Sequence, residues 1–150
     1  MATTKGRINA ISISQQRGTK KDNVPFARLE TDSGVSGDAH AGDWHRQVSL
    51  LAVESIGKMK AAGAKVSPGD FAENITTEGI DLQSLVIGAR LRLGTDAELE
   101  VTQFGKACHN RCEIYEQIGD CIMPREGIFA KVTKAGPIRV GDTIEVISDD

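Results

Sequence analysis

Glycine spacing is the feature that most limits what this chain can fold into. Sixteen glycines are spread over 150 residues, and glycine is a strong local breaker of helices and strands. Several of the short runs between them alternate apolar with polar residues, which is the period of a strand with one buried face. We expect short strands within residues 7–14, 24–30, 86–93, 97–104, 127–136 and 139–146, the second of them beginning near Pro25. The short apolar run at 48–53 predicts a further strand.

One strand pattern occurs twice, as "VIGARLRL" (86–93) and "RVGDTIEV" (139–146), and each copy indicates a turn that leads into a strand. The matching apolar positions are Leu91 and Leu93 in the first copy and Ile144 and Val146 in the second. The best early helix is 53–63, which would end at Gly63 as a helix C′ residue. We expect a mostly β fold, a compact antiparallel barrel with two or three short helices; α+β is the alternative.

Bulk properties restrict the class of protein. A chain of 150 residues is most simply one domain, 1–150, and can bury a core without a disulfide. A net charge of −3 gives no global attraction to nucleic acid or anionic membrane. The first 18 residues lack a secretory signal pattern, and no apolar run is long enough to span a bilayer. We therefore expect a cytoplasmic protein with reduced thiols and neither nucleic-acid nor membrane partners.

All three cysteines lie in one stretch, "GKACHNRCEIYEQIGDC" (105–121). An odd number of cysteines argues against a disulfide framework, and the C-x3-C-x8-C spacing lacks the paired ligands usual in structural zinc sites. Asn110 and Glu113 resemble the capping box of a short helix ending at Gly119. That helix would place Cys112 at its positively polarised start beside Arg111, where the thiolate is favoured.

The roles of the individual cysteines stay open. Cys112 is a reactive or metal-ligating thiolate, or it is an inert buried side chain. Cys108, next to His109, would lie in the loop before the helix and has the same alternatives. Cys121 is best explained as a small buried hydrophobe.

A second polar stretch, "SGVSGDAHAGDWHRQVSLL" (33–51), combines glycines with histidines and the only tryptophan. Its glycines allow backbone amides to approach an anionic ligand closely. Arg46 has the side chain for pairing with a phosphate, and Asp38, His40 and His45 are suited to orient polar ligand atoms. A surface turn is the simpler alternative, and a metal site formed by Asp38, His40 and His45 is a weaker one.

Residues 67–85, "SPGDFAENITTEGIDLQSL", contain a third polar run. Pro68 and Gly69 indicate a turn, and the polar side chains of Glu73 and Asn74 precede a short helix or turn. By itself this segment is typical of a loop.

Taken together, these stretches resemble the MOSC domain family, named for molybdenum cofactor sulfurase C-termini. The matching segments are "GVSGDAHAGDWHRQVSLLAVESI", "PGDFAENITTEGIDLQSLVIGARLRLG", "LEVTQFGKACHNRCEI" and "MPREGIFAKVTKAGPIRVGDTIEV". They follow the family's order over residues 6–148, and the chain is most similar to the short, stand-alone bacterial form. The resemblance implies a distorted β-barrel with small helices, like the barrel domain of pyruvate kinase.

The resemblance also implies molybdenum cofactor (molybdopterin) binding and sulfur-carrier or sulfur-transfer chemistry at a cysteine. In larger relatives, including amidoxime-reducing enzymes, a cysteine in this region ligates molybdenum. Its match here is Cys112, with Cys108 close enough in sequence to exchange with it. The candidate catalytic residues are therefore Cys112 and Cys108, and the candidate metal ligand is Cys112. The candidate cofactor-binding residues are Gly37, Asp38, His40, His45, Arg46, Glu73, Asn74, His109 and Arg111.

The leading hypothesis is a protein that binds molybdenum cofactor or its pterin precursor and carries sulfur through a reactive cysteine. The chain contains no aminotransferase-like desulfurase domain and no additional N-terminal β domain, and these departures from larger relatives favour a carrier role. Its expected partners are proteins of molybdenum cofactor biosynthesis or molybdoenzymes. One alternative is a molybdenum-dependent reductase of N-hydroxylated substrates, served by an electron-donor flavoprotein. Another is a non-catalytic interaction module.

Overall fold

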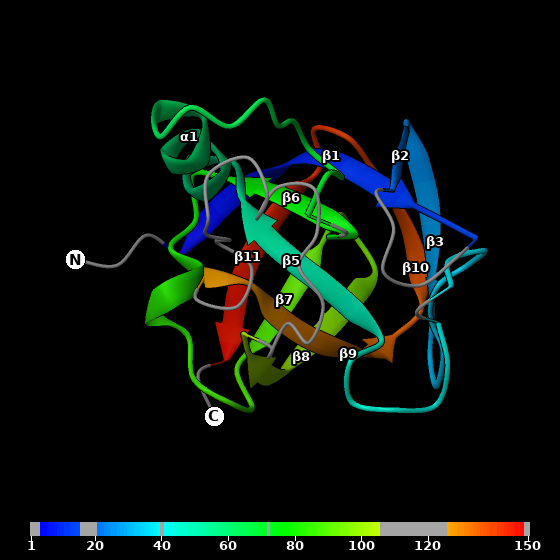
Figure 1. Cartoon of the computed structure of the whole chain (residues 1–150). Helices are drawn as coiled ribbons and strands as arrows, with labels where there is room; N and C mark the ends of the chain where they lie inside the picture. The colour runs from blue at the N-terminus through cyan, green and yellow to red at the C-terminus, as the bar shows by residue number, and fades with distance from the viewer. Residues whose placement is uncertain (1–3, 16–20, 40, 72, 106–125, 149–150) are drawn as a thin grey trace.

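Seven strands close into a barrel (Figure 1). Their hydrogen-bonded order is β11-β7-β8-β9-β5-β6-β1, and β1 pairs in turn with β11, which closes the ring. The computed structural model describes residues 4–15, 21–39, 41–71, 73–105 and 126–148. The barrel strands are β1 (Lys5–Ile13), β5 (Val48–Ala52), β6 (Ile75–Glu78), β7 (Arg90–Leu93), β8 (Ala97–Phe104), β9 (Ile128–Lys134) and β11 (Thr143–Ser148). The mostly β barrel predicted from the sequence is confirmed.

A second, three-stranded sheet packs beside the barrel. It consists of β10 (Gly136–Arg139), β3 (Phe26–Glu30) and β4 (Gly34–Val35), with β10 near β8 and β3 near β9. The strand predicted over 24–30, beginning near Pro25, is confirmed as β3, which starts at Phe26. Val24 belongs instead to β2 (Asp22–Val24), which pairs with β1, and the chain changes sheet at Pro25. Proline has no N–H for a ladder, so it suits such a break.

One pair of barrel strands departs from the predicted antiparallel arrangement. β5 and β6 run parallel, with Leu50 opposite Ile75, and a parallel neighbour needs a crossover connection, which α1 (Val53–Ala61) supplies. Residues 75–78 were expected to be loop. Thr76 and Thr77 are nevertheless fully buried, because a β-branched side chain can pack inside a sheet whether or not it is polar.

The repeated sequence pattern forms a real structural pair. β7 and β11 are antiparallel neighbours, with Leu93 opposite Ile144 and Leu91 opposite Val146. Along β7 the two arginines are exposed and the two leucines are fully buried, as the alternation predicts. The two copies therefore lie side by side in the barrel wall and turn the same face inward.

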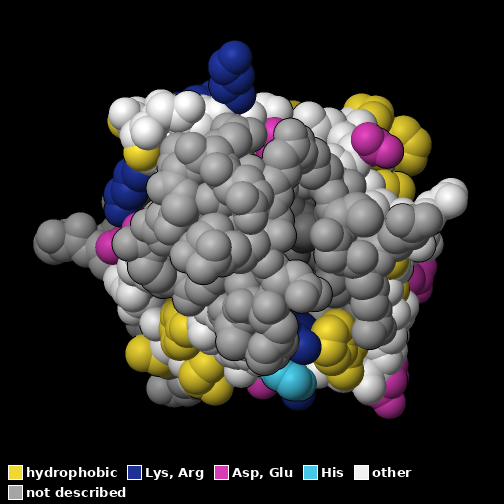
Figure 2. All heavy atoms as spheres, viewed as in Figure 1, with side chains coloured by type: hydrophobic (Ala, Val, Ile, Leu, Met, Phe, Trp, Pro, Cys, Tyr) yellow, Lys and Arg dark blue, Asp and Glu magenta, His cyan; other side chains and the backbone are white. Residues whose placement is uncertain are grey.

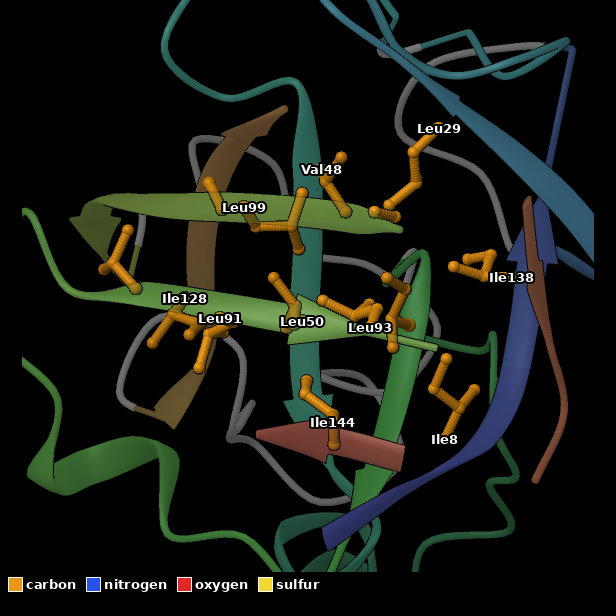
Figure 3. Packing of buried hydrophobic residues seen from close by; sticks show 14 of the residues in the cluster. Ile8, Leu29, Val48, Leu50, Leu91, Leu93, Leu99, Ile128, Ile138 and Ile144 are labelled. Carbon is orange, nitrogen blue, oxygen red and sulfur yellow. The ribbon is translucent and has the colours of Figure 1, made fainter. Parts of the chain in front are cut away.

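Leucine, isoleucine and valine side chains fill the barrel interior. Figure 3 shows Leu50, Leu91 and Leu99 from three different strands pointing toward one another, and all three are fully buried. Each such side chain contributes about 1.5–3 kcal/mol relative to an exposed one. The same cluster also contains Ile8, Val48, Leu93, Ile128, Ile138 and Ile144.

Helix α1 covers one side of the barrel, opposite β3 and β10 (Figure 1). It packs Ile56 and Met59 into a second apolar cluster with Phe71 and Phe129. The helix ends at its C-cap residue Ala62, and Gly63 follows with φ +105°, as predicted for a C′ glycine. A 3₁₀ turn, η1 (Leu82–Ser84), is the other described helix. Neither is long and apolar enough to cross a lipid bilayer, and the helix predicted at 110–119 lies outside the described residues.

Candidate functional site

The segment between β4 and β5 is fastened to the ends of β8 and β9. The Thr102 hydroxyl donates to the carbonyl of His45, and the His45 ring nitrogen Nε2 lies 2.8 Å from Oε1 of Gln103. Two residues later, Oε1 of Gln47 accepts a hydrogen bond of 2.9 Å from the backbone N–H of Val132. Contacts on both sides therefore fix the position of Arg46, which lies between these two anchors.

The guanidinium of Arg46 lies against two aromatic rings. Its guanidinium carbon lies 4.6 Å from the centroid of the Trp44 ring and 5.7 Å from that of Phe129. Its Nε is buried and has no hydrogen-bond partner within the described part of the chain. A buried, unsatisfied donor of this kind costs about 1–3 kcal/mol, and more when the group is charged. A planar cation with unused N–H groups is suited to bind an anion.

An open cleft of about 500 Å³ lies beside this segment. Trp44 forms part of its wall, as do Asp32, Asp43 and Lys131. The remaining lining residues are Thr31, His45, Gln47, Thr102, Val132 and Thr133. Figure 2 shows histidine, basic and acidic side chains meeting at the lower edge of one face, with apolar side chains on either side.

A second groove, of about 320 Å³, lies beside α1 and offers less to a ligand. Its Glu126 carboxylate is bound by Lys58 at 3.0 Å and by the Ser55 hydroxyl at 2.6 Å. The carboxylate of Glu54, also in the groove, accepts from the backbone N–H of Gly79 at 2.9 Å. These acceptors already have partners within the chain, so the cleft beside Trp44 is the stronger candidate.

Asp38, one of the predicted cofactor-binding residues, forms a buried ion pair. Its Oδ1 lies 2.7 Å from Nζ of Lys21, and both side chains are 0% exposed. The same oxygen accepts from the backbone N–H of Ser14 at 3.0 Å. Asp38 thus fastens the glycine-rich segment to the end of β1. Gly37, just before it, is exposed with φ +84°, and a Cβ there would meet nothing within 4 Å.

Glu73 and Asn74, two further predicted cofactor contacts, are fully buried. Glu73 accepts hydrogen bonds from the Phe71 backbone N–H at 3.2 Å and the Thr76 hydroxyl at 2.9 Å. Burial away from water raises the pKa of the Glu73 carboxyl, although these hydrogen bonds oppose the shift. Asn74 is bonded to the backbone of Ser49 at 3.0 Å. Neither residue lines the cleft beside Trp44.

The remaining predicted site residues lie outside the described residues: His40, Cys108, His109, Arg111 and Cys112. Within the part of the chain that the structure describes, no cluster of three or more histidine, cysteine or acidic side chains could hold a metal ion. The proposed metal ligand Cys112 and the weaker site involving His40 stay predictions.

The chain enters and leaves the cysteine-bearing segment at one place. The backbone N–H of Gly105 donates to the carbonyl of Gly127 at 2.7 Å. Nε2 of Gln103 donates to the carbonyl of Gly105 at 2.7 Å, while Oε1 of the same amide faces His45. The described ends of this segment are therefore linked directly to the segment that carries Arg46.

Sequence reasoning did not identify Gln103, Phe129 or Asp32 as parts of the site. Gln103 and Asp32 are ordinary polar residues with no motif around them, and Phe129 reads as one more apolar residue of a strand. Trp44 could have been found, because it is the only tryptophan and stands between glycines and Arg46.

Comparison with known proteins agrees with this architecture. The model of the MOSC domain matches residues 37–145. YuaD from Bacillus subtilis has a similar structure with a TM-score of 0.81 and 18% identity, over 97% of each chain. YiiM from Geobacillus stearothermophilus has a TM-score of 0.67 and 16% identity, over 94% of this chain and 74% of its own. YiiM from Escherichia coli has a TM-score of 0.65 and 19% identity, over 95% of this chain and 70% of its own.

At these identities the solved structures establish a shared fold and nothing finer. No curated protein sequence matches the chain. The family model, however, covers most of the described barrel as well as the segment that holds Trp44 and Arg46. The chain belongs to the MOSC domain family, which is associated with the binding of molybdenum cofactor.

Proposed function

We propose that this protein binds molybdenum cofactor, or its pterin precursor, with Arg46 holding the anionic phosphate. The observation that carries the proposal is the buried Nε of Arg46, which has no hydrogen-bond partner among the described residues. The cofactor's phosphate supplies acceptors for such a donor, and arginine binds phosphate through two parallel N–H groups. Satisfying a buried charged donor offsets the free energy that its burial costs.

The surroundings of Arg46 fit this role. Trp44 and Phe129 contact the guanidinium, so that little side-chain freedom remains to be lost on binding. The net charge of −3 gives no general attraction for anions, which makes a local cationic site necessary. His45 lies next to Arg46 and is held by Gln103, and it is the second candidate contact for the cofactor.

We also propose that a cysteine thiolate carries sulfur and ligates molybdenum. When bound, the cofactor would supply a molybdenum centre with sulfur ligands, for which a soft thiolate is a matching ligand. We assign that thiolate to Cys112, with Cys108 as the other candidate, both outside the described residues. As a sulfur carrier, the thiolate would attack the outer sulfur of a donor persulfide, forming a new S–S bond and releasing the donor's thiolate. The link from His45 through Gln103 to Gly105 supports this assignment, because it joins the cofactor segment to the start of the cysteine-bearing one.

The test is retention of purified molybdopterin by Arg46→Gln, measured after gel filtration as bound pterin per protein. Loss of one or two charge-assisted hydrogen bonds should weaken binding about tenfold or more. Arg139→Gln is the matched control, since Arg139 also lies over an aromatic ring, that of Phe26 at 5.9 Å, but is exposed. Wild type that retains no molybdopterin, or an Arg46→Gln protein that retains it fully, contradicts the proposal.

The cysteine assignment has a separate test. Cys112→Ser and Cys108→Ser proteins, loaded with molybdenum cofactor, are compared with wild type by X-ray absorption at the metal. Loss of one sulfur ligand in the Cys112→Ser protein alone supports Cys112, and loss in the Cys108→Ser protein alone moves the role to Cys108. Identical spectra in all three proteins remove cysteine ligation. Turnover of an N-hydroxylated substrate with an electron donor would favour the reductase alternative over the carrier.

A further inference from the structure

Two exposed carboxylates, those of Asp32 and Asp43, line the cleft beside Trp44. Asp32 comes from the turn between β3 and β4, and Asp43 comes from the segment just before Trp44. Within the described part of the chain, neither carboxylate takes part in a hydrogen bond or ion pair. The ammonium of Lys131, in the same cleft, lies 3.7 Å from Glu100 on the neighbouring strand. The cleft therefore offers two carboxylates that form no ion pair with any described residue.

A ligand for this cleft should carry several N–H donors and a flat ring. The volume of about 500 Å³ lies within the range of small-molecule sites. Trp44 supplies an aromatic wall, and an aromatic ring packs well against another flat ring. A pterin has both properties, because its ring N–H and 2-amino group point in the same direction from one edge. A carboxylate offers two oxygens that accept both hydrogens at once.

We propose that this cleft binds the 2-amino-4-oxopyrimidine edge of a pterin, with Asp32 and Asp43 accepting its N–H donors. The inference rests on the proposed function, because it assigns the other end of the same ligand. Arg46 covers one face of the Trp44 ring and does not line the cleft. Trp44 therefore stands between a cationic site and a site rich in carboxylates.

The difference in charge fixes the orientation of the ligand. Molybdopterin carries its phosphate and its pyrimidine edge at opposite ends. A phosphate beside Asp32 and Asp43 would meet like charges, whereas the N–H and 2-amino donors of the pyrimidine edge beside Arg46 would face other donors. With the phosphate at Arg46 and the pyrimidine edge at Asp32 and Asp43, each end of the ligand faces a complementary group.

The experiment is calorimetric titration with pterin and with lumazine, which has an oxygen in place of the 2-amino group. Both lack a phosphate and so probe the cleft without Arg46. We expect lumazine to bind about tenfold more weakly, or worse, since it leaves a carboxylate oxygen without its donor. Quenching of Trp44, the only tryptophan, reports that the ligand lies in this cleft. Guanosine, which has the same donor edge on another ring, is the third ligand.

Asp43→Asn and Asp32→Asn should each lower pterin affinity about tenfold and remove the preference over lumazine. Asp22→Asn is the control, because Asp22 is exposed in β2 and does not line the cleft. Equal affinity for pterin and lumazine, absence of pterin binding, unchanged binding by both variants, or tighter binding of guanosine overturns the inference.

The result also separates this inference from the proposed function. Arg46→Gln should lose molybdopterin but still bind pterin more tightly than lumazine, because the two phosphate-free ligands differ only at the edge that faces the carboxylates. If molybdopterin binding depends on Arg46 but pterin and lumazine are not distinguished, only the present inference fails. If pterin is distinguished while Arg46→Gln retains molybdopterin, the inference holds and the phosphate site at Arg46 fails.

Discussion

Breaking the buried Lys21–Asp38 pair should destabilise the protein more than any surface change. Both side chains are 0% exposed and their charged atoms are 2.7 Å apart. Removing one partner leaves the other charge buried, which costs about 3–5 kcal/mol. Lys21→Met and Asp38→Asn should each show a loss of this size, a large part of the roughly 5–15 kcal/mol that stabilises a domain.

The double variant provides the stronger test. With Lys21→Met and Asp38→Asn combined no charge remains, and an asparagine oxygen can still accept the Ser14 N–H that Asp38 accepts at 3.0 Å. The double variant therefore loses one or two ordinary hydrogen bonds, which should lower its free energy of unfolding by about 1–2 kcal/mol. The two single losses sum to about 6–10 kcal/mol, so the coupling between the sites should be at least about 4 kcal/mol.

The assay is urea unfolding, followed both by far-UV circular dichroism and by fluorescence of Trp44. Coincident transitions show that the pair stabilises the whole fold. An earlier fluorescence transition shows that only the segment carrying Trp44 is released. Single losses below about 1 kcal/mol, or single losses that simply add in the double variant, would refute the reasoning.

Three other sets of substitutions test the barrel and its backbone. Burial raises the pKa of Glu73 above its ordinary value of 4.5. As the pH rises above 4.5, the carboxyl ionises in the unfolded chain but stays protonated in the folded one, so the free energy of unfolding falls until the folded carboxyl also ionises. Glu73→Gln should not show this decline. At Gly69, with φ +96°, a Cβ would lie 2.5 Å from the Lys21 carbonyl oxygen, so Gly69→Ala should cost about 2 kcal/mol or more in thermal unfolding. Gly57→Ala, within α1 and with nothing within 4 Å of the added carbon, should stabilise by about 0.5–1 kcal/mol. Leu91→Ala removes a fully buried side chain and should cost about 2–5 kcal/mol by urea unfolding.

The barrel strands that bury only one face could be predicted from the sequence. In β7 and β8 apolar side chains alternate with exposed or half-exposed ones, and this period can be read directly from the sequence. β6 fails the same test. Three of its four residues are buried, and two of these are threonines. The polarity of threonine predicts a loop here, whereas its β-branched side chain correctly predicts a strand. Its parallel pairing depends on the α1 crossover, which no local pattern specifies.

Residue type alone could not separate ligand contacts from structural contacts. Asp38 and Arg46 are charged residues of the same glycine-rich segment, and the sequence predicts both as ligand contacts. The fold gives Asp38 a buried cation, while the Nε of Arg46 is buried without a hydrogen-bond partner among the described residues. Lys21, the partner of Asp38, comes from the start of β2, and Phe129, beside Arg46, comes from β9. Contacts made over such sequence separations decide which polar residue remains available to a ligand.

The buried polar residues near the site have a common consequence. Asp38, Glu73 and Asn74 each fix a loop or strand end to the barrel through hydrogen bonds inside the protein. Such bonds have well-defined directions, whereas apolar packing does not, so they specify one arrangement of the connecting segments. A segment held in one arrangement loses less entropy when a ligand binds. Asp38 anchors the segment that carries Arg46, so loosening this anchor should weaken molybdopterin binding even though Asp38 does not line the cleft.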